Sequence, residues 1–209
     1  MSLLQRALAA FLLIAASPLI ALIAVLLALC QGRPVLFRQW RSGLGGEAFR
    51  LVKFRTMRDT RDATGALLPD RARVTAMGKF LRQSRLDELP SLWNVIRGEL
   101  AFIGPRPLLP ATIASLGEAG RQRGQVLPGL TGWSQVNGNT LLTLAEKVSL
   151  DLWYIDHRSI RTDMEIVART VWVMTRGEKR SIAASACNIG RLSPTSVVHD
   201  YHMGEEPPP

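Results

Sequence analysis

One long apolar segment near the N-terminus constrains this chain more than any other feature. Between Ala7 and Cys30, Ser17 and Pro18 are the only residues that interrupt the apolar side chains. As a straight helix, this run of roughly 24 residues would measure about 36 Å, which is enough to cross a hydrocarbon core of about 30 Å. The segment therefore predicts a chain that associates with a membrane.

Ser17-Pro18 lies close to the middle of this segment, and two topologies fit it. Proline removes a backbone N–H donor and disturbs the preceding turn, so the helix can break there. Each half, roughly 17 Å long, would then reach the middle of the bilayer and return. Arg6 before the segment and Arg33 after it suit a segment with both ends in the cytoplasm. A kinked spanning helix has the same ingredients, so these features alone leave spanning and re-entrant helices open.

The remainder of the chain reads as a mixture of short strands and amphipathic helices. Residues 35–39 and 49–54 have the composition of strands, and the glycine-rich residues 42–47 between them predict a hairpin turn. Neither Walker nor Rossmann glycine spacing is present. Apolar residues recur at helical spacing in residues 76–86 and 164–175. Such helices either cover a soluble core or lie in a membrane interface.

Charge narrows the classes of partner. The formal net charge is +9 and the sequence pI is about 10.7, which suggests nucleic acid, an anionic membrane or a phosphorylated substrate. A nucleic-acid binder would alternate aromatic and basic residues on one stacking face. The six Phe and five Trp instead fall mostly in apolar patterns. We therefore predict membrane lipids and a phosphorylated substrate as partners, and no nucleic acid.

One adjacent acid pair stands out as a candidate for chemistry. Asp87 and Glu88 precede Pro90 and are surrounded by basic residues, with Arg82 and Arg85 before them. Proline is favoured at the first position of a helix, so the pair is predicted to lie at a helix junction where both carboxylates can converge. Magnesium is commonly held by one or two carboxylates together with substrate phosphates. A surface acid pair that forms salt bridges with nearby arginines is the alternative.

Two further motifs could bind phosphate. Arg106 lies between Pro105 and Pro107, and the stiff backbone would aim its guanidinium for two-pronged phosphate binding. Alternation along a strand would place Lys53 and Arg55 on one face, where they form either a cationic wall for a diphosphate or a solvent-exposed face. We also regard Arg82, beside the acid pair, as a candidate phosphate-binding residue.

These features occur together and in one order along the chain. After the apolar segment come KFRTM at 53–57, LDELP at 86–90, GPRP at 104–107, PGLTGWSQVNG at 128–138 and DLWYIDHRS at 151–159. The ordered set closely resembles the small bacterial monotopic phosphoglycosyl transferases, also called the bacterial sugar transferase family. The resemblance covers roughly residues 1–180. Arg85 departs from the family pattern, which often has a small or apolar residue before LDEL.

The resemblance implies an enzyme that moves a phosphosugar from a UDP-sugar to undecaprenyl phosphate and releases UMP, as the first membrane step of glycan assembly. It implies that Asp87 is the nucleophile that carries the phosphosugar, that Glu88 assists with Mg²⁺, and that Arg106 binds phosphate. It also implies a re-entrant helix broken at Ser17-Pro18, at the cytoplasmic face of the inner membrane. A membrane-anchored sensor of nucleotide sugars is a rival function, but it would not need both acids.

We accordingly expect an α+β fold with three parts. Residues 1–32 form the re-entrant membrane helix-break-helix, and residues 33–189 form a compact interfacial catalytic domain with a short β-hairpin and amphipathic helices. Residues 190–209, rich in proline at the end, are predicted to be a mobile tail.

Overall fold

The computed structural model of the chain describes residues 2–180. The predicted tail at 190–209 lies outside the described residues. The longer helices are α1 (Leu3–Ala15), α2 (Ser17–Gln31), α4 (Ala76–Gln83), α9 (Leu144–Asp156) and α10 (Ile160–Arg176). The shorter ones are α3 (Asp70–Arg73), α5 (Leu92–Arg97), α6 (Pro110–Ser115), α7 (Glu118–Arg123) and α8 (Trp133–Val136). The strands are β1 (Leu36–Ser42), β2 (Ala48–Phe54), β3 (Ala101–Ile103) and β4 (Gly129–Thr131), so the predicted α+β class is confirmed.

The apolar segment forms two helices that meet at the predicted break. α1 ends at Ala15, α2 begins at Ser17 with Pro18 in its first turn, and the two axes are bent by 56°. Proline is tolerated in a first turn because its missing N–H would have no helical partner there. Among residues 2–180, no single helix has both the length and the apolar character needed to cross a membrane, whereas the bent pair passes that test when its two halves are combined.

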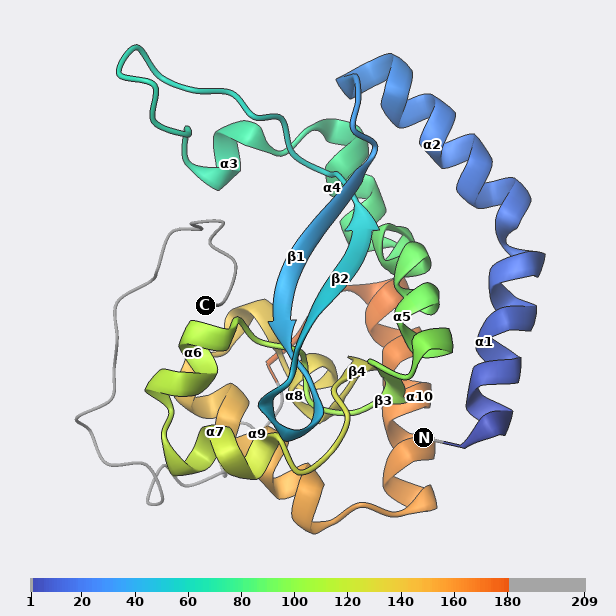
Figure 1. Cartoon of the computed structure of the whole chain (residues 1–209), viewed down its shortest axis with the longest axis vertical. Coiled ribbons are helices and arrows are strands. Elements are labelled where there is room, and N and C mark those ends of the chain that lie inside the picture. The colour runs from blue at the N-terminus through green and yellow to red at the C-terminus, as the bar shows by residue number, and fades with distance from the viewer. Residues whose placement is uncertain (1, 181–209) are drawn as a thin grey trace.

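Both halves of the bent pair pack against the rest of the protein along one side of the molecule (Figure 1). Ala9 of α1 is fully buried in a cluster with Val95 of α5 and Leu100. In α2, Ile23 and Leu27 join a second cluster with residues of β2 and α4. The outward faces remain apolar, and the large exposed side chains there are Leu3, Leu4, Leu8, Phe11, Leu12, Ile14, Leu19, Leu22, Val25 and Leu29.

β1 and β2 form the predicted antiparallel hairpin, in a register that pairs Leu36 with Phe54 and Ser42 with Ala48. The first strand extends beyond the predicted residues 35–39, since β1 continues through Arg41 to Ser42. The turn contains the 3₁₀ segment η1 (Leu44–Gly46), where Gly45 and Gly46 have φ of 67° and 85°. Glycine is favoured at such left-handed positions because it lacks a Cβ.

A second, smaller sheet was not predicted. β3 and β4 pair in parallel, with Ala101 opposite Gly129 and Ile103 opposite Thr131. Three-residue strands give too short a pattern for sequence reasoning to detect, and residues 128–132 read as turns. The pair matters because it brings the GPRP and PGLTG motifs side by side.

The two predicted amphipathic regions are helical, with adjusted ends. The first, expected over 76–86, ends at Gln83 because Arg85 adopts a left-handed conformation with φ of 58°. A 3₁₀ segment, η2 (Leu86–Ser91), follows and leads into α5. The second begins earlier than predicted, at Ile160, because the Ser159 hydroxyl accepts the Thr162 N–H as an N-cap. A further 3₁₀ segment, η3 (Asn139–Leu141), precedes α9.

Candidate active site

The acid pair lies in the first turn of η2, at the junction between α4 and α5. The left-handed Arg85 interrupts the helix just before the pair, and Pro90 lies within η2 rather than at the first residue of α5. The sequence prediction of a helix junction is therefore confirmed, with a tighter helical form than expected. Because 3₁₀ geometry has about three residues per turn, adjacent side chains point in well-separated directions, and Asp87 and Glu88 meet different neighbours.

Two polar side chains just after the acid pair dock this junction onto β2. The Ser91 hydroxyl donates to Val52 O at 2.6 Å, and Asn94 Oδ1 accepts the Val52 N–H at 3.1 Å. Asn94 Nδ2 also donates to Arg50 O at 2.7 Å. Ser91 and Asn94 are almost fully buried. Sequence reasoning missed both residues, although they use backbone groups on the β2 edge that faces away from β1 and so fix η2 beside Lys53.

Glu88 is held by three cations from three different parts of the chain. Its Oε1 lies 2.7 Å from Lys53 Nζ and 3.4 Å from Arg106 Nη2, and its Oε2 lies 3.8 Å from Arg85 Nη1. Burial alone would raise the pKa of Glu88, but the charges of Lys53, Arg106 and Arg85 outweigh that effect and lower the pKa to about 2. Glu88 is therefore ionised at any physiological pH.

Asp87 has a contrasting environment one residue away. Its carboxylate makes no ion pair or hydrogen bond with another side chain or backbone group within residues 2–180, and the residue is only 8% exposed. Burial, followed by the negative charge of Glu88, raises the pKa of Asp87 above its ordinary value, against the opposing charges of Lys53, Arg82 and Arg106. Of the two acids, Asp87 is therefore the one that has no direct cation partner.

The GPRP loop is fixed by close backbone contact with the PGLTG loop. Gly104 N–H donates to Thr131 O at 2.9 Å, and Gly129 N–H donates to Pro105 O at 2.9 Å. A Cβ on Gly104 would lie 2.4 Å from Leu127 O, and one on Gly129 would lie 2.1 Å from Gly104 N. Only glycine fits at both positions, so the two motifs form one rigid unit from which Arg106 projects.

A buried ion pair supports this unit from behind. Arg123, at the end of α7, pairs with Asp151 of α9 at 2.5 Å, and their side chains are 4% and 1% exposed. The Nη2 of Arg123 also donates to Arg106 O at 2.9 Å. Asp151 begins the DLWYIDHRS motif, so one contribution of that motif is to hold the backbone of Arg106 through Arg123.

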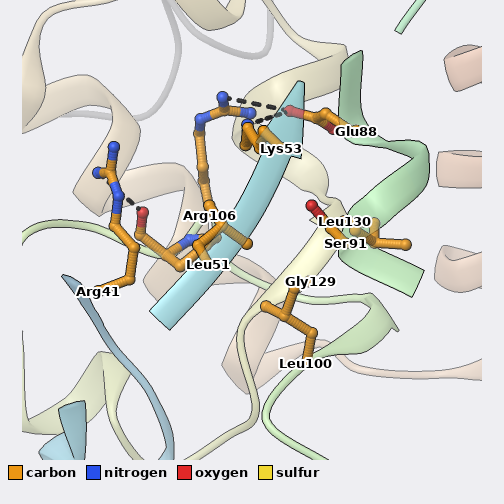
Figure 2. Close-up of a pocket in the computed structure, with 10 residues that line it drawn as sticks. Arg41, Leu51, Lys53, Glu88, Ser91, Leu100, Arg106, Gly129 and Leu130 are labelled. Atoms are coloured by element: carbon orange, nitrogen blue, oxygen red, sulfur yellow. Dashed lines mark hydrogen bonds and ion pairs between the residues drawn. The ribbon is translucent and has the colours of Figure 1, made fainter. Parts of the chain in front are cut away.

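A cavity opens between the hairpin, η2 and the GPRP loop (Figure 2). Its polar lining consists of Arg41, Lys53, Glu88, Ser91 and Arg106, and its apolar lining of Leu51, Leu100, Pro107, Gly129 and Leu130. The cavity thus brings together Lys53, Glu88 and Arg106 from three separate motifs. It also contains Arg41, which the sequence analysis did not select, because a single arginine in a strand has no distinguishing local pattern.

The other two predicted phosphate-binding residues have different contacts. Arg55 Nη2 donates to Gln31 O at 2.6 Å and to Gly32 O at 2.8 Å, so it caps the C-terminal end of α2. Cationic side chains are favoured at that end by the helix dipole. Arg82 Nε donates to Thr56 Oγ1 at 2.8 Å, and its charge acts on Asp87. Neither arginine lines the cavity, and a phosphate-binding role for them stays a prediction.

The carboxylate oxygens of the acid pair fit a magnesium ion whose other ligands would be the phosphate oxygens of a bound substrate and water. Within residues 2–180, no group of three or more acidic, histidine or cysteine side chains could hold a metal by itself. Magnesium does not require such a group, because it usually combines one or two carboxylates with phosphate oxygens and water. Asp87 is a buried carboxylate without a cation partner and would supply such a ligand. In Glu88, Oε1 faces Lys53 and Arg106, whereas Oε2 has, among the described residues, only Arg85, at 3.8 Å, and would supply the second carboxylate ligand.

Comparison with known proteins identifies relatives over most of the chain. The model of the bacterial sugar transferase family matches residues 2–177. An uncharacterized sugar transferase of Bacillus subtilis (strain 168) is 44% identical over 163 residues, which are 78% of this chain and 81% of that protein. The undecaprenyl-phosphate glucose phosphotransferase of Komagataeibacter xylinus is 42% identical over 77% of this chain. The UDP-glucose:undecaprenyl-phosphate glucose-1-phosphate transferase of Escherichia coli (strain K12) is 39% identical over 79% of this chain.

The relatives differ in the fraction of their own length that matches this chain. The matched region makes up 33% of the Komagataeibacter xylinus protein and 38% of the Escherichia coli protein. The matched part of this chain therefore spans well under half of those two longer proteins. The acid pair, the GPRP motif and the bent helix pair all fall within the residues that match the family model.

Proposed function

This chain belongs to the bacterial sugar transferase family, and from that premise we propose that it transfers a phosphosugar from a UDP-sugar to undecaprenyl phosphate and releases UMP. The observation that carries the proposal is a cavity whose lining carries more positive than negative charge. Asp87 does not itself line this cavity, but it precedes the lining residue Glu88 in the chain, feels the charges of Lys53 and Arg106, and has no direct cation partner among the described residues. The cationic wall suits a diphosphate, and the acid suits nucleophilic attack. The names of the Komagataeibacter xylinus and Escherichia coli relatives specify glucose, so UDP-glucose is the first donor to test.

In the first step, Arg106 and Lys53 hold the diphosphate of the donor against the cavity wall. Arginine offers paired donors for phosphate oxygens, and lysine offers a mobile point charge. An Asp87 carboxylate oxygen attacks the phosphorus that bears the sugar. The bond from that phosphorus to the bridging oxygen breaks, and UMP leaves with the electron pair, so that an acyl phosphate joins Asp87 to the phosphosugar.

In the second step, a phosphate oxygen of undecaprenyl phosphate attacks the same phosphorus. The bond from phosphorus to Asp87 breaks, the carboxylate is restored, and the product is a lipid diphosphate sugar. We assign the nucleophile to Asp87 because Glu88 is occupied by three cations and its low pKa makes it a weak nucleophile. Glu88 in this assignment keeps Lys53 and Arg106 correctly oriented at the reacting phosphate.

We propose Mg²⁺ as the cofactor, with Asp87 and Glu88 as its protein ligands and substrate phosphates as the others. When bound, the ion would supply charge neutralisation between the carboxylates and the diphosphate. Asp87 and Glu88 provide the oxygen ligands that magnesium prefers.

We also propose that α1 and α2 form a re-entrant hairpin at the cytoplasmic face of the bacterial inner membrane. The 56° bend, the insufficient length of either helix alone and the exposed apolar faces support this topology. In such an arrangement, α1 and α2 dip into the lipid while the cavity stays at the interface. A soluble nucleotide sugar and a membrane-bound lipid phosphate would then meet at one site, which supplies part of the rate enhancement by proximity.

The covalent step can be tested without a lipid acceptor. Purified protein mixed with UDP-glucose and Mg²⁺ should release a burst of UMP of about one equivalent per active site, as covalent catalysis requires. Intact mass spectrometry should detect one added phosphosugar, which Asp87→Asn should abolish. Asp70→Asn, an exposed acid of α3, is the matched control and should behave like the wild type. Wild-type turnover by Asp87→Asn would refute the covalent mechanism.

A further inference from the structure

Arg41 lines the cavity on the side away from Glu88. In Figure 2, Arg106 lies between Arg41 and Glu88, and the electrostatic contacts agree with that order. Arg106 acts on both Glu88 and Arg41, whereas Glu88 has no direct contact with Arg41. Arg41 belongs to β1, and its Nη1 donates to Pro107 O at 3.3 Å while its Nη2 donates to Gln39 Oε1.

Arg41 is a cation without a compensating acid. No acidic side chain of the described chain forms an ion pair with it, and its Nε is buried without a hydrogen-bond partner. Burial and the nearby charge of Arg106 lower the pKa of Arg41 to about 10, which reflects how poorly its positive charge is solvated. A guanidinium has five N–H donors, and its contacts with Pro107 and Gln39 leave part of that capacity unused. An anion in the cavity would satisfy it.

The charges lining the cavity indicate which anion fits. Lys53 and Glu88 form a close pair that is neutral overall, which leaves Arg106 and Arg41 as two positive charges along one wall. A diphosphate carries its charge on two adjacent phosphates. In the proposed reaction, Asp87 attacks the phosphate that bears the sugar, which would lie nearest Glu88, so the phosphate at the far end would belong to the nucleotide.

We propose that Arg41, together with Arg106, forms a binding subsite for the nucleotide phosphate that departs as part of UMP. This inference rests on the proposed function for the identity of the nucleotide. Arg41 is then needed to bind UDP-sugar and to retain UMP. It is not needed after UMP has left, so transfer from Asp87 to undecaprenyl phosphate proceeds without it.

The test measures binding of UMP and of uridine to the full chain in lipid nanodiscs. Arg41→Gln should weaken UMP binding by about 10- to 100-fold, as expected for loss of a charged hydrogen bond, and should leave uridine binding unchanged. Arg38→Gln is the matched control, because Arg38 is exposed on β1 and does not line the cavity. Unchanged UMP binding in Arg41→Gln, or equal losses for UMP and uridine, would overturn the proposal.

A role limited to bracing Pro107 is tested with a double variant. If Arg41 contacts UMP, Arg41→Gln/Arg106→Gln should bind UMP more weakly than Arg106→Gln alone. If Arg41 acts only by positioning Arg106, those two variants should have the same affinity, and the subsite is then refuted.

A measurement on the wild-type protein does not depend on any variant folding. UMP, but not uridine, should protect Arg41 from an arginine-selective dicarbonyl reagent, as read by peptide mass spectrometry, and modification of Arg38 should be unaffected. Absence of protection would contradict the proposal. Because binding is measured apart from turnover, protein that binds UMP through Arg41 but releases no UMP from UDP-sugars would refute the proposed function and leave the subsite standing.

Discussion

The ammonium group of Lys53 lies 2.7 Å from Oε1 of Glu88, and the two residues are 35 positions apart in the chain. This contact joins β2 to η2, and it exists because Ser91 and Asn94 dock η2 and α5 onto the backbone of β2. Burial lowers the pKa of Lys53, while Glu88 opposes that shift. The pair keeps a carboxylate ionised at the wall of a cavity that otherwise carries positive charge.

Replacing Lys53 should weaken the site without unfolding the protein. Lys53→Gln removes the shortest ion-pair contact of Glu88 and one candidate phosphate donor, so kcat/KM for UDP-glucose should fall by roughly 10- to 100-fold, corresponding to about 1.5–3 kcal/mol for a hydrogen bond between charged groups. Lys79→Gln, on the exposed surface of α4, should have little effect. Equal activity of the two variants would exclude a role for Lys53 in the reaction.

The two adjacent acids should titrate in well-separated pH ranges. In magnesium-free buffer, carboxyl ¹³C NMR should find the pKa of Asp87 above its ordinary value of 3.8 and that of Glu88 near 2. Because the folded-state pKa of Glu88 lies below 4.5, its charge stabilises the fold above about pH 4.5, and this contribution is lost as the pH falls toward 2. Asp87→Asn and Glu88→Gln assign the signals, and the reverse order of pKa values would contradict the structure.

Removal of magnesium should stop UMP release. EDTA should abolish the burst, and excess MgCl₂ should restore it, because the diphosphate and two carboxylates would otherwise repel one another. In the NMR titration, Mg²⁺ together with UMP should lower the pKa of Asp87, since a bound cation favours the ionised form. A full burst in EDTA would show that the acid pair works without a metal.

Variants of the buried Arg123–Asp151 pair distinguish its contribution to the stability of the fold from its role in positioning Arg106. Asp151→Asn should destabilise the fold by about 3–5 kcal/mol, because it strands a buried guanidinium. In the double variant Arg123→Met/Asp151→Leu, much of that stability should return because apolar side chains replace the buried charges. The carbonyl oxygen of Arg106 still lacks the hydrogen bond that Arg123 donates in the wild type. We expect chemical denaturation to report the recovery while UMP affinity remains low. Recovery of both would reduce the pair to a structural role.

The re-entrant topology predicts that the two ends of the bent helix pair lie on the same side of the membrane. Cys30 is exposed at the end of α2 and serves as one reporter after Cys187 is replaced by serine. Ser2→Cys, with Cys30 and Cys187 replaced, serves as the other. An impermeant thiol reagent should label both from the cytoplasmic side of sealed vesicles. Labelling from opposite sides would establish a spanning helix, which is the outcome we expect when Ser17 and Pro18 are both changed to alanine.

Local sequence patterns predicted the features that depend on a few neighbouring residues. Pro18 marks the break between α1 and α2, and glycines mark the turn of the β1–β2 hairpin. The acid pair before Pro90 indicated a helix junction, which η2 confirms. These predictions succeeded because proline, glycine and apolar periodicity restrict the backbone within one or two turns of chain.

The tertiary structure alone decided which charges meet. Lys53 and Arg55 are two residues apart and looked equivalent, yet Lys53 reaches Glu88 whereas Arg55 caps α2. Arg41 had no local signal and became part of the cavity because β1 passes beside the GPRP loop. A charged side chain finds its partner only after distant segments have packed, since the energy of an ion pair depends on distance and burial rather than on sequence neighbours. The sequence by itself therefore determined the broken apolar helix, the hairpin, the amphipathic helices and the family, whereas packing decided the β3–β4 pairing and the electrostatic arrangement of the site.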